Sequence, residues 1–232
     1  MILRTLQLRV PVHTRDFASV LIAEESHDPF RVLVVTILSQ NCTDVAAVKA
    51  YRRLDERIGV APHLLARAQS RMIASSIRVA GLHHQKAKAL RELALVISSN
   101  YDGDLVQILR EPLEQARKQL QELPKVGPKT ADVLLGVWGI PTISVDTHVS
   151  RVTKRLGLTS SGSKYNETRS DLMTLFKKVD YPRVPILFMA HGRRYCKARR
   201  PLCSACPIQR LCPYPVKTKE IGRSTPKKAR YG

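Results

Sequence analysis

Apolar residues recur at intervals of three and four along most of this chain, which is the spacing that places them on one face of an α-helix. No segment of useful length alternates between apolar and polar residues, as a half-buried strand would, and no internal repeat is found. Residues 1–15 show no clear period, and we expect an irregular start there. The pattern therefore predicts an all-α protein, with helices near residues 16–26, 29–38, 44–55, 69–79, 84–99, 112–121, 131–138, 147–156, 166–178 and 183–195.

Capping residues support several of these helices. Asp28 followed by Pro29 is typical of a helix start, because the aspartate accepts bonds from free amide groups and proline suits the first turn. Thr43 can begin the next helix in the same way. The apolar run 32–38 would also suit a strand, but the start signal before it and the helical segments around it favour a buried helix.

The charge of the chain indicates a polyanionic partner. Its 232 residues carry a formal net charge of +20, and the pI is near 10.2. Such an excess favours nucleic acid ahead of an anionic membrane, although a generally basic surface is the plain alternative. No apolar run approaches the ~20 residues of a membrane span, and residues 1–4 lack the apolar core of a signal peptide. We expect an intracellular protein of the cytoplasm or nucleoid.

The end of the chain, residues 216–232, is basic and contains proline, glycine and serine. A solvated, unfolded terminus and a segment attracted to phosphate groups are equally good interpretations.

Residues 123–151 combine a tight turn with two helix starts. Pro124, Gly127 and Pro128 punctuate the turn, Lys129 opens an apolar helix, and Asp146 precedes the next helix. Amide groups at a glycine turn and a helix start have no helical partner and attract anions, so this segment can hold a phosphate whatever the base sequence. Taken alone, Lys129 is a phosphate-binding lysine and Asp146 an ordinary helix cap.

Four of the five cysteines lie within 17 residues near the end of the chain. Their spacing, C-x6-C-x2-C-x5-C, brings Cys196, Cys203, Cys206 and Cys212 around one small centre. Zinc usually takes two C-x2-C pairs. The longer intervals here slightly favour a four-iron cluster. Cys42 stands apart and is more often a small buried residue than a ligand.

The two motifs together resemble the endonuclease III family of DNA glycosylases. Residues 123–131 read LPKVGPKTA and residues 145–148 read VDTH, similar to the helix-hairpin-helix signature of that family. The one departure is Lys125, where the family usually has glycine, a residue that supplies a positive φ. The resemblance covers about residues 29–212, and its cysteine loop follows the hairpin in the family order.

That resemblance implies a two-lobed helical glycosylase fold. Residues 29–139 form a helical domain with the hairpin; residues 1–28 and 140–215 form a second domain that carries the cluster loop, 196–212. The loop binds a 4Fe–4S cluster through its four cysteines. Lys129 is implied as the nucleophile that attacks sugar C1′, and Asp146 as the carboxylate that stabilises positive charge on the sugar. The expected activity is a bifunctional glycosylase and AP lyase.

The resemblance also implies how double-stranded DNA is held. The target base must leave the stack, and either Gln40 or Asn41 fills the space. The other expected DNA contacts are Lys125, Val126 and Gly127 of the hairpin. His148 either faces the base or is an ordinary core or surface histidine. Lys197, Arg199 and Arg200 of the cluster loop either contact the DNA backbone or only offset the charge of the cluster.

By analogy with the family, the expected substrates are oxidised or ring-saturated pyrimidines, handled by a monomer that does not bind a membrane. A mismatch-specific or adenine-removing glycosylase on the same fold is the alternative among enzymes. A non-catalytic DNA-binding protein is another, but such a protein would have lost Lys129 or Asp146. An electron-transfer protein fits poorly with a charge of +20.

Overall fold

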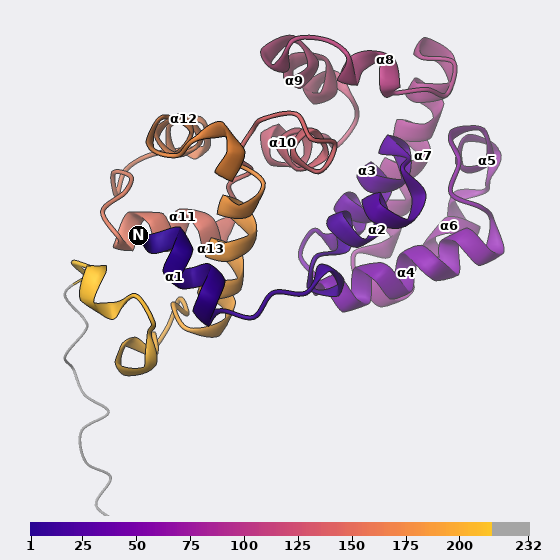
Figure 1. The fold of residues 1–232 in the computed structure, drawn as a ribbon. Helices are drawn as coiled ribbons and strands as arrows, with labels where there is room; N and C mark the ends of the chain where they lie inside the picture. Colours follow the sequence, from indigo (N-terminus) through magenta and orange to yellow (C-terminus); the bar gives the residue numbers. More distant parts are fainter. Residues whose placement is uncertain (215–232) are drawn as a thin grey trace, which may run out of the picture.

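The computed structural model describes residues 1–214, and within that range every regular element is helical. Figure 1 shows two groups of helices joined by extended segments. The α-helices are α1 (Ile2–Arg9), α2 (Ala18–Ser26), α3 (Pro29–Ser39), α4 (Asp44–Arg57), α5 (Pro62–Arg67), α6 (Ser70–Ser76), α7 (His83–Asn100), α8 (Val106–Leu109), α9 (Leu113–Glu122), α10 (Pro128–Val137), α11 (Thr147–Arg155), α12 (Tyr165–Leu175) and α13 (Arg183–Arg194). The all-α prediction is confirmed.

The predicted caps are present. The Asp28 carboxylate accepts hydrogen bonds from the Phe30 and Arg31 amides at 2.8 and 3.4 Å, and α3 begins with Pro29. The Thr43 hydroxyl accepts one from the Ala46 amide at 3.2 Å, at the start of α4. The apolar run that also suited a strand is the buried α3.

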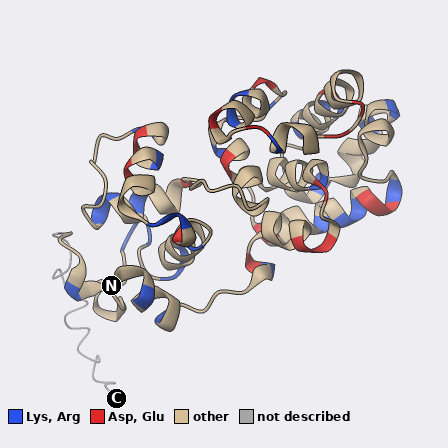
Figure 2. Cartoon of the chain, turned by 45° about the horizontal axis from the view of Figure 1, so that its top comes forward, with Lys and Arg blue, Asp and Glu red and all other residues tan. Residues whose placement is uncertain are grey.

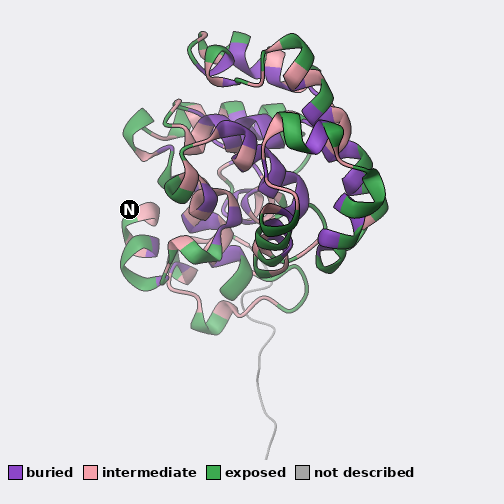
Figure 3. Ribbon diagram, turned by 90° about the vertical axis from the view of Figure 1, so that its right-hand side faces the viewer, coloured by how far each residue is buried: buried purple, intermediate pink, exposed green. Residues whose placement is uncertain are grey.

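Two hydrophobic cores hold the helices together. The larger core takes its side chains from α2 to α10, and Phe30 and Tyr51 are among its largest buried residues. The smaller core joins α1, α11, α12 and α13 to Ile208 of the C-terminal loop, around Leu6 and Phe188. In Figure 3 the buried positions line the facing sides of the helices, as expected for one apolar stripe on each helix.

The irregular start predicted for residues 1–15 is wrong. Residues 2–9 form α1, which packs against α13 and buries Leu6 completely, with Val10 just beyond its end. The apolar positions 2, 3, 6 and 10 do follow a helical period, but the basic residues between them hide it.

The first domain boundary also differs from the prediction. Residues 1–28 were all expected in the second domain, yet α2 packs against α3 and contributes Ala18 and Ile22 to the larger core. Of residues 1–28, α1 and Val10 belong to the smaller core. The short helices α5 and α8 were not predicted, and the basic tail, 216–232, lies outside the described residues.

Helix α10 lies where the two groups of helices meet. It packs against α9, α3 and α2 of the larger group and also contacts α12 of the smaller group. Residues 139–146 then lead from the end of α10 to α11. Lys129, on α10, and Asp146, at the start of α11, therefore belong to helices that pack in different cores.

Candidate active site

The predicted hairpin is a tight turn between α9 and α10. Lys125 adopts a positive φ of +61°, the conformation that glycine would supply at no steric cost. Val126 is buried beneath the turn, and Gly127 is the extended residue before α10. Proline occupies the first position of α10, where its missing N–H costs nothing. The turn therefore has a positive φ at position 125 although the residue is a lysine.

Lys129 follows directly, in the first turn of α10, and its side chain is exposed. The next residues, Thr130 and Ala131, are buried and hold the helix against the core, whereas the Lys129 amine is accessible to a ligand.

Asp146 caps the start of α11. Its Oδ1 accepts a hydrogen bond from the Val149 amide at 2.7 Å, and the residue is half-buried. The second oxygen accepts no hydrogen bond within the described part of the chain. Asp146 is thus the helix cap expected of such a residue, with one oxygen left for other chemistry.

His148 lies on the first turn of α11, packed against α13. Its Nδ1 is 3.0 Å from Nη2 of Arg151, which also donates to the Gly192 carbonyl at 3.1 Å. A Cβ at Gly192 would lie 2.9 Å from the His148 Cβ, so only glycine permits this approach. Burial lowers the pKa of His148, although the carboxylate of Asp146 acts in the opposite direction. The imidazole is therefore neutral at pH 7.

The two candidates for base replacement, Gln40 and Asn41, are exposed in the turn between α3 and α4. Asn41 has a positive φ of +56°, which asparagine tolerates better than most residues. Beside them, the Cys42 thiol donates to the Leu38 carbonyl at 3.0 Å, and burial raises its pKa. Cys42 was predicted to be a small buried residue, and it is half-buried.

A cavity of about 500 Å³ brings this turn together with His148. Its walls include Cys42, Thr43, His148 and Arg193. Arg193 on α13 also donates to the Asp44 carboxylate at 2.7 Å, at the start of α4. The cavity is therefore lined from both groups of helices, and a cross-lobe ion pair closes one side.

Leu82 and Lys86 were not among the predicted site residues. Leu82 is 52% exposed with a positive φ of +47°, just before α7. The buried Lys86 ammonium donates to the carbonyls of Leu38 and Ala80, both at 2.8 Å. One cation thus ties the end of α3 to the turn that carries Leu82. In the sequence, a leucine directly after a glycine was the available sign of the turn at Leu82. Lys86 gave no sign of its role, because it reads as an ordinary lysine on an amphipathic helix.

Asp132, on α10, is 0% exposed and is held by four side chains. Arg117 of α9 donates from Nε to both carboxylate oxygens at 3.1 Å, and Nε of Arg169 lies 3.1 Å from Oδ1. The hydroxyls of Thr142 and Tyr165 donate at 2.9 and 2.8 Å. The carboxylate therefore joins α9, α10 and α12 across the junction of the two cores.

The four cysteines surround one small cavity, of about 30 Å³, between α11, α13 and the C-terminal loop. Arg155 donates to the Cys196 thiol at 3.3 Å, and the backbone of Arg155 lies 3.5 Å from Cys212 Sγ. Four cysteines around one small cavity, with a cation beside them, fit an anionic iron–sulfur cluster.

Arg155 also sets the path of the loop that begins at Cys196. Its guanidinium donates to the carbonyls of Lys197 and Ala198 at 2.8 and 3.0 Å. Lys197, Arg199 and Arg200 are all exposed. The loop between the first two cysteines thus presents its cations to solvent. Elsewhere, basic side chains are distributed over both groups of helices (Figure 2).

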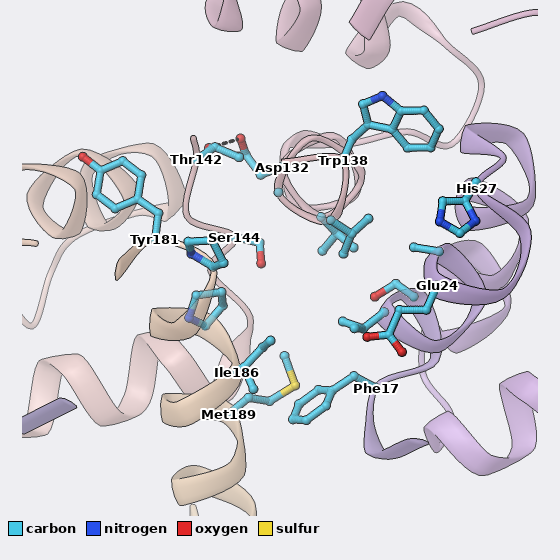
Figure 4. Close-up of a pocket in the computed structure, with 18 residues that line it drawn as sticks. Phe17, Glu24, His27, Asp132, Trp138, Thr142, Ser144, Tyr181, Ile186 and Met189 are labelled. Atoms are coloured by element: carbon cyan, nitrogen blue, oxygen red, sulfur yellow. Dashed lines mark hydrogen bonds between the residues drawn. The ribbon is translucent and has the colours of Figure 1, made fainter. Parts of the chain in front are cut away.

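A second, more apolar cavity of about 530 Å³ lies between α2, α10 and α13. Figure 4 shows Trp138 at one end and Phe17 with Met189 at the other. Asp132 and Ser144 line this cavity, but Lys129 and Asp146 do not. Within residues 1–214, no helix is both long and apolar enough to cross a membrane.

Comparison with known proteins gives two matches along the chain. Residues 34–178 match the HhH-GPD superfamily of base excision DNA repair proteins, and residues 196–212 match the iron–sulfur binding domain of endonuclease III. The matched segments contain the hairpin with Lys129 and Asp146, and the four cysteines.

Individual relatives agree. Endonuclease III of Sulfolobus acidocaldarius is 35% identical over 88% of this chain and 90% of its own. A solved trapped covalent intermediate of endonuclease III with DNA is 34% identical and covers 81% of this chain and 84% of its own, with a TM-score of 0.72. A thermostable thymine-DNA glycosylase is 26% identical over 92% of both chains, with a TM-score of 0.72. The chain therefore belongs to the endonuclease III family of the HhH-GPD superfamily, and it carries the iron–sulfur domain of that family.

Proposed function

We propose that this protein is a bifunctional DNA glycosylase and AP lyase that removes oxidised or ring-saturated pyrimidines from double-stranded DNA. The observation that carries the proposal is that this chain of the family has both an exposed Lys129 in the hairpin and a half-buried Asp146 at the start of α11. The protein acts as a monomer on chromosomal DNA inside the cell.

Each of the two residues has a distinct part in the reaction. As the base leaves with the electrons of the C1′–N bond, Asp146 stabilises the positive charge that develops on the sugar. The neutral amine of Lys129 then attacks C1′ and loses a proton. The C1′–O4′ bond breaks as O4′ takes up a proton, which opens the sugar ring and leaves a Schiff base between Lys129 and C1′. Loss of a proton from C2′ then expels the 3′ phosphate, which cuts the strand.

Three of the contacts to DNA lie around the hairpin, the turn after α3 and the cavity beside His148. The amides around Val126 and Gly127, with Lys125, bind phosphate at the hairpin. The turn with Gln40 and Asn41 enters the stack, and the exposed Leu82 approaches it from the neighbouring turn. The 500 Å³ cavity beside His148 receives the extruded base.

The iron–sulfur cluster has a structural part in this proposal. Cys196, Cys203, Cys206 and Cys212 hold it, and the cluster supplies a rigid anchor for the loop between the first two cysteines. Lys197, Arg199 and Arg200 contact the DNA backbone from that loop.

Borohydride trapping tests the assignment of the amine. The parent protein should become covalently linked to lesion-bearing DNA, and Lys129→Gln should abolish the link while specific binding remains. Lys125→Gln, which removes another exposed lysine of the same hairpin, should still be trapped. Asp146→Asn should slow base removal by ~10²–10³-fold and strand cleavage at a preformed abasic site by less. Trapping that survives Lys129→Gln would show that the amine is wrongly assigned.

Removal of thymine from mismatches is the second candidate function. The similarity to a thermostable thymine-DNA glycosylase, 26% identical over 92% of this chain, favours it. A protein that excises thymine opposite guanine and is never trapped by borohydride would support this function and exclude the lyase.

A further inference from the structure

The hydroxyl of Tyr165 occupies a position between the two predicted catalytic elements. It lies 3.4 Å from the amide nitrogen of Val145, which donates to it, and 3.5 Å from the carbonyl oxygen of Pro128. Val145 directly precedes Asp146, and Pro128 directly precedes Lys129. One oxygen atom therefore touches the main chain next to both residues.

The direction of the hydroxyl proton is set by Asp132. Tyr165 has one proton to donate, and the shortest contact, 2.8 Å, is to Oδ2 of that buried carboxylate. Its oxygen remains free to accept from Val145. Because Asp132 is itself held by Arg117 and Arg169, the hydroxyl is fixed by a rigid partner. Burial, with the charge of Asp132, raises the pKa of Tyr165 far above its usual range, so the proton stays in place.

We propose that Tyr165 is a positioning residue, which sets the distance between the Lys129 amine and the Asp146 carboxylate by bridging the segments that carry them. This inference rests on the proposed function. Lys129 belongs to a helix of the larger core and Asp146 to a helix of the smaller one, so their separation depends on contacts across the junction. Tyr165, at the start of α12, makes that contact. Its hydroxyl accepts from the amide of Val145, next to Asp146, and donates to Asp132, which lies on the same helix as Lys129.

Thr142 offers a matched control for this position. Its hydroxyl also donates to Asp132, at 2.9 Å, and it additionally accepts from Arg169 at 3.0 Å. Within the described residues, Thr142 makes no hydrogen bond to Pro128 or Val145. Thr142→Val therefore removes a hydroxyl from the same carboxylate without touching the catalytic segments.

The test compares Tyr165→Phe with Thr142→Val under single-turnover conditions at saturating enzyme. The substrates are a duplex with thymine glycol and a duplex with a preformed abasic site. Phenylalanine fills the same volume, so both variants should fold, with melting temperatures lowered by a few degrees and unchanged affinity for a tetrahydrofuran abasic analogue. Tyr165→Phe should slow both reactions by about tenfold to a hundredfold, the usual cost of a misplaced reacting group. Thr142→Val should stay within about twofold of the parent rate.

A double-mutant cycle separates positioning from general loss of structure. In an Asp146→Asn background, removing the Tyr165 hydroxyl should slow base removal by less than about threefold, because the carboxylate that it positions is gone. Equal rates for Tyr165→Phe and Thr142→Val, or additive losses in the cycle, would overturn the inference. A parent protein that removes no base and forms no covalent link would instead overturn the proposed function, whatever the variants do.

Discussion

Asp132→Asn should destabilise the protein strongly, because it removes the charge at the junction of the two cores. The Arg117 and Arg169 side chains, 10% and 8% exposed, would lose their shared counter-charge. Breaking a buried ion pair by removing one partner costs about 3–5 kcal/mol. Glu114 lies 3.0 Å from Arg169 but is 68% exposed, and such a pair contributes only about 0–1 kcal/mol. We therefore expect a loss of about 3 kcal/mol in the free energy of unfolding, the low end of that range.

Thermal unfolding measures this loss directly. For a chain of this size, 1 kcal/mol shifts the melting temperature by about 2–4 °C, so Asp132→Asn should lower it by about 6–12 °C. Circular dichroism at 222 nm follows the helices, and cluster absorbance follows the C-terminal loop. Asp171→Asn on α12 is the control: it removes a half-buried carboxylate that has no ion pair in the described chain, and it should shift the melting temperature by less than about 2 °C. Equal shifts for the two variants would refute the reasoning.

Three further results are expected. Lys125→Gly should change stability by less than about 1 kcal/mol in a urea titration, because relief of the positive φ offsets the entropy of glycine; a large loss would mean that the lysine side chain holds the hairpin. Replacing Arg199 and Arg200 by alanine should lessen the salt dependence of binding to undamaged duplex by roughly one to two in log–log slope, and an unchanged slope would mean that these cations only balance the cluster. At pH values between the lowered pKa of His148 in the folded protein and its unfolded pKa of about 6.5, the unfolded chain binds more protons than the folded one. The contribution of His148 to stability is then fully present above about pH 6.5 and is lost as the pH falls. The drop in melting temperature from pH 7 to pH 5 should therefore be smaller in His148→Gln than in the parent. An identical drop would assign the acid sensitivity to other groups.

Local chemistry explains why much of the fold was predictable from the sequence. Asp28 and Thr43 cap their helices within three residues, so their effect does not depend on the rest of the chain. The hairpin was predictable from residues 123–131, although the lysine left its φ open; the turn imposes a positive φ on whichever residue is present. The placement of the four cysteines around one cavity follows from short intervals in the same way.

Contacts between distant segments were not predictable. Asp132 lies in an apolar helical run, and its partners are 10 to 37 residues away along the chain, so its burial depends on how α9, α10 and α12 pack. Lys86 gave no signal in the sequence, because its burial depends on the end of α3, 48 residues earlier, which accepts a hydrogen bond from its ammonium. The assignment of α2 to the larger core follows equally from packing, since a short amphipathic helix can pack on either core.

The order of the helices has a consequence for how the protein is made. Residues 18–138 lie between α1 and α11 in the chain, so the larger core is inserted within the smaller one. At 5–20 residues per second, α1 waits roughly 9–35 seconds after its own synthesis before α13, its packing partner, emerges. The larger core can fold during that time and carries the hairpin with Lys129. Asp146 and Tyr165 follow later, so a chain that stops early can hold DNA by its hairpin but lacks the carboxylate and the bridge that the chemistry needs.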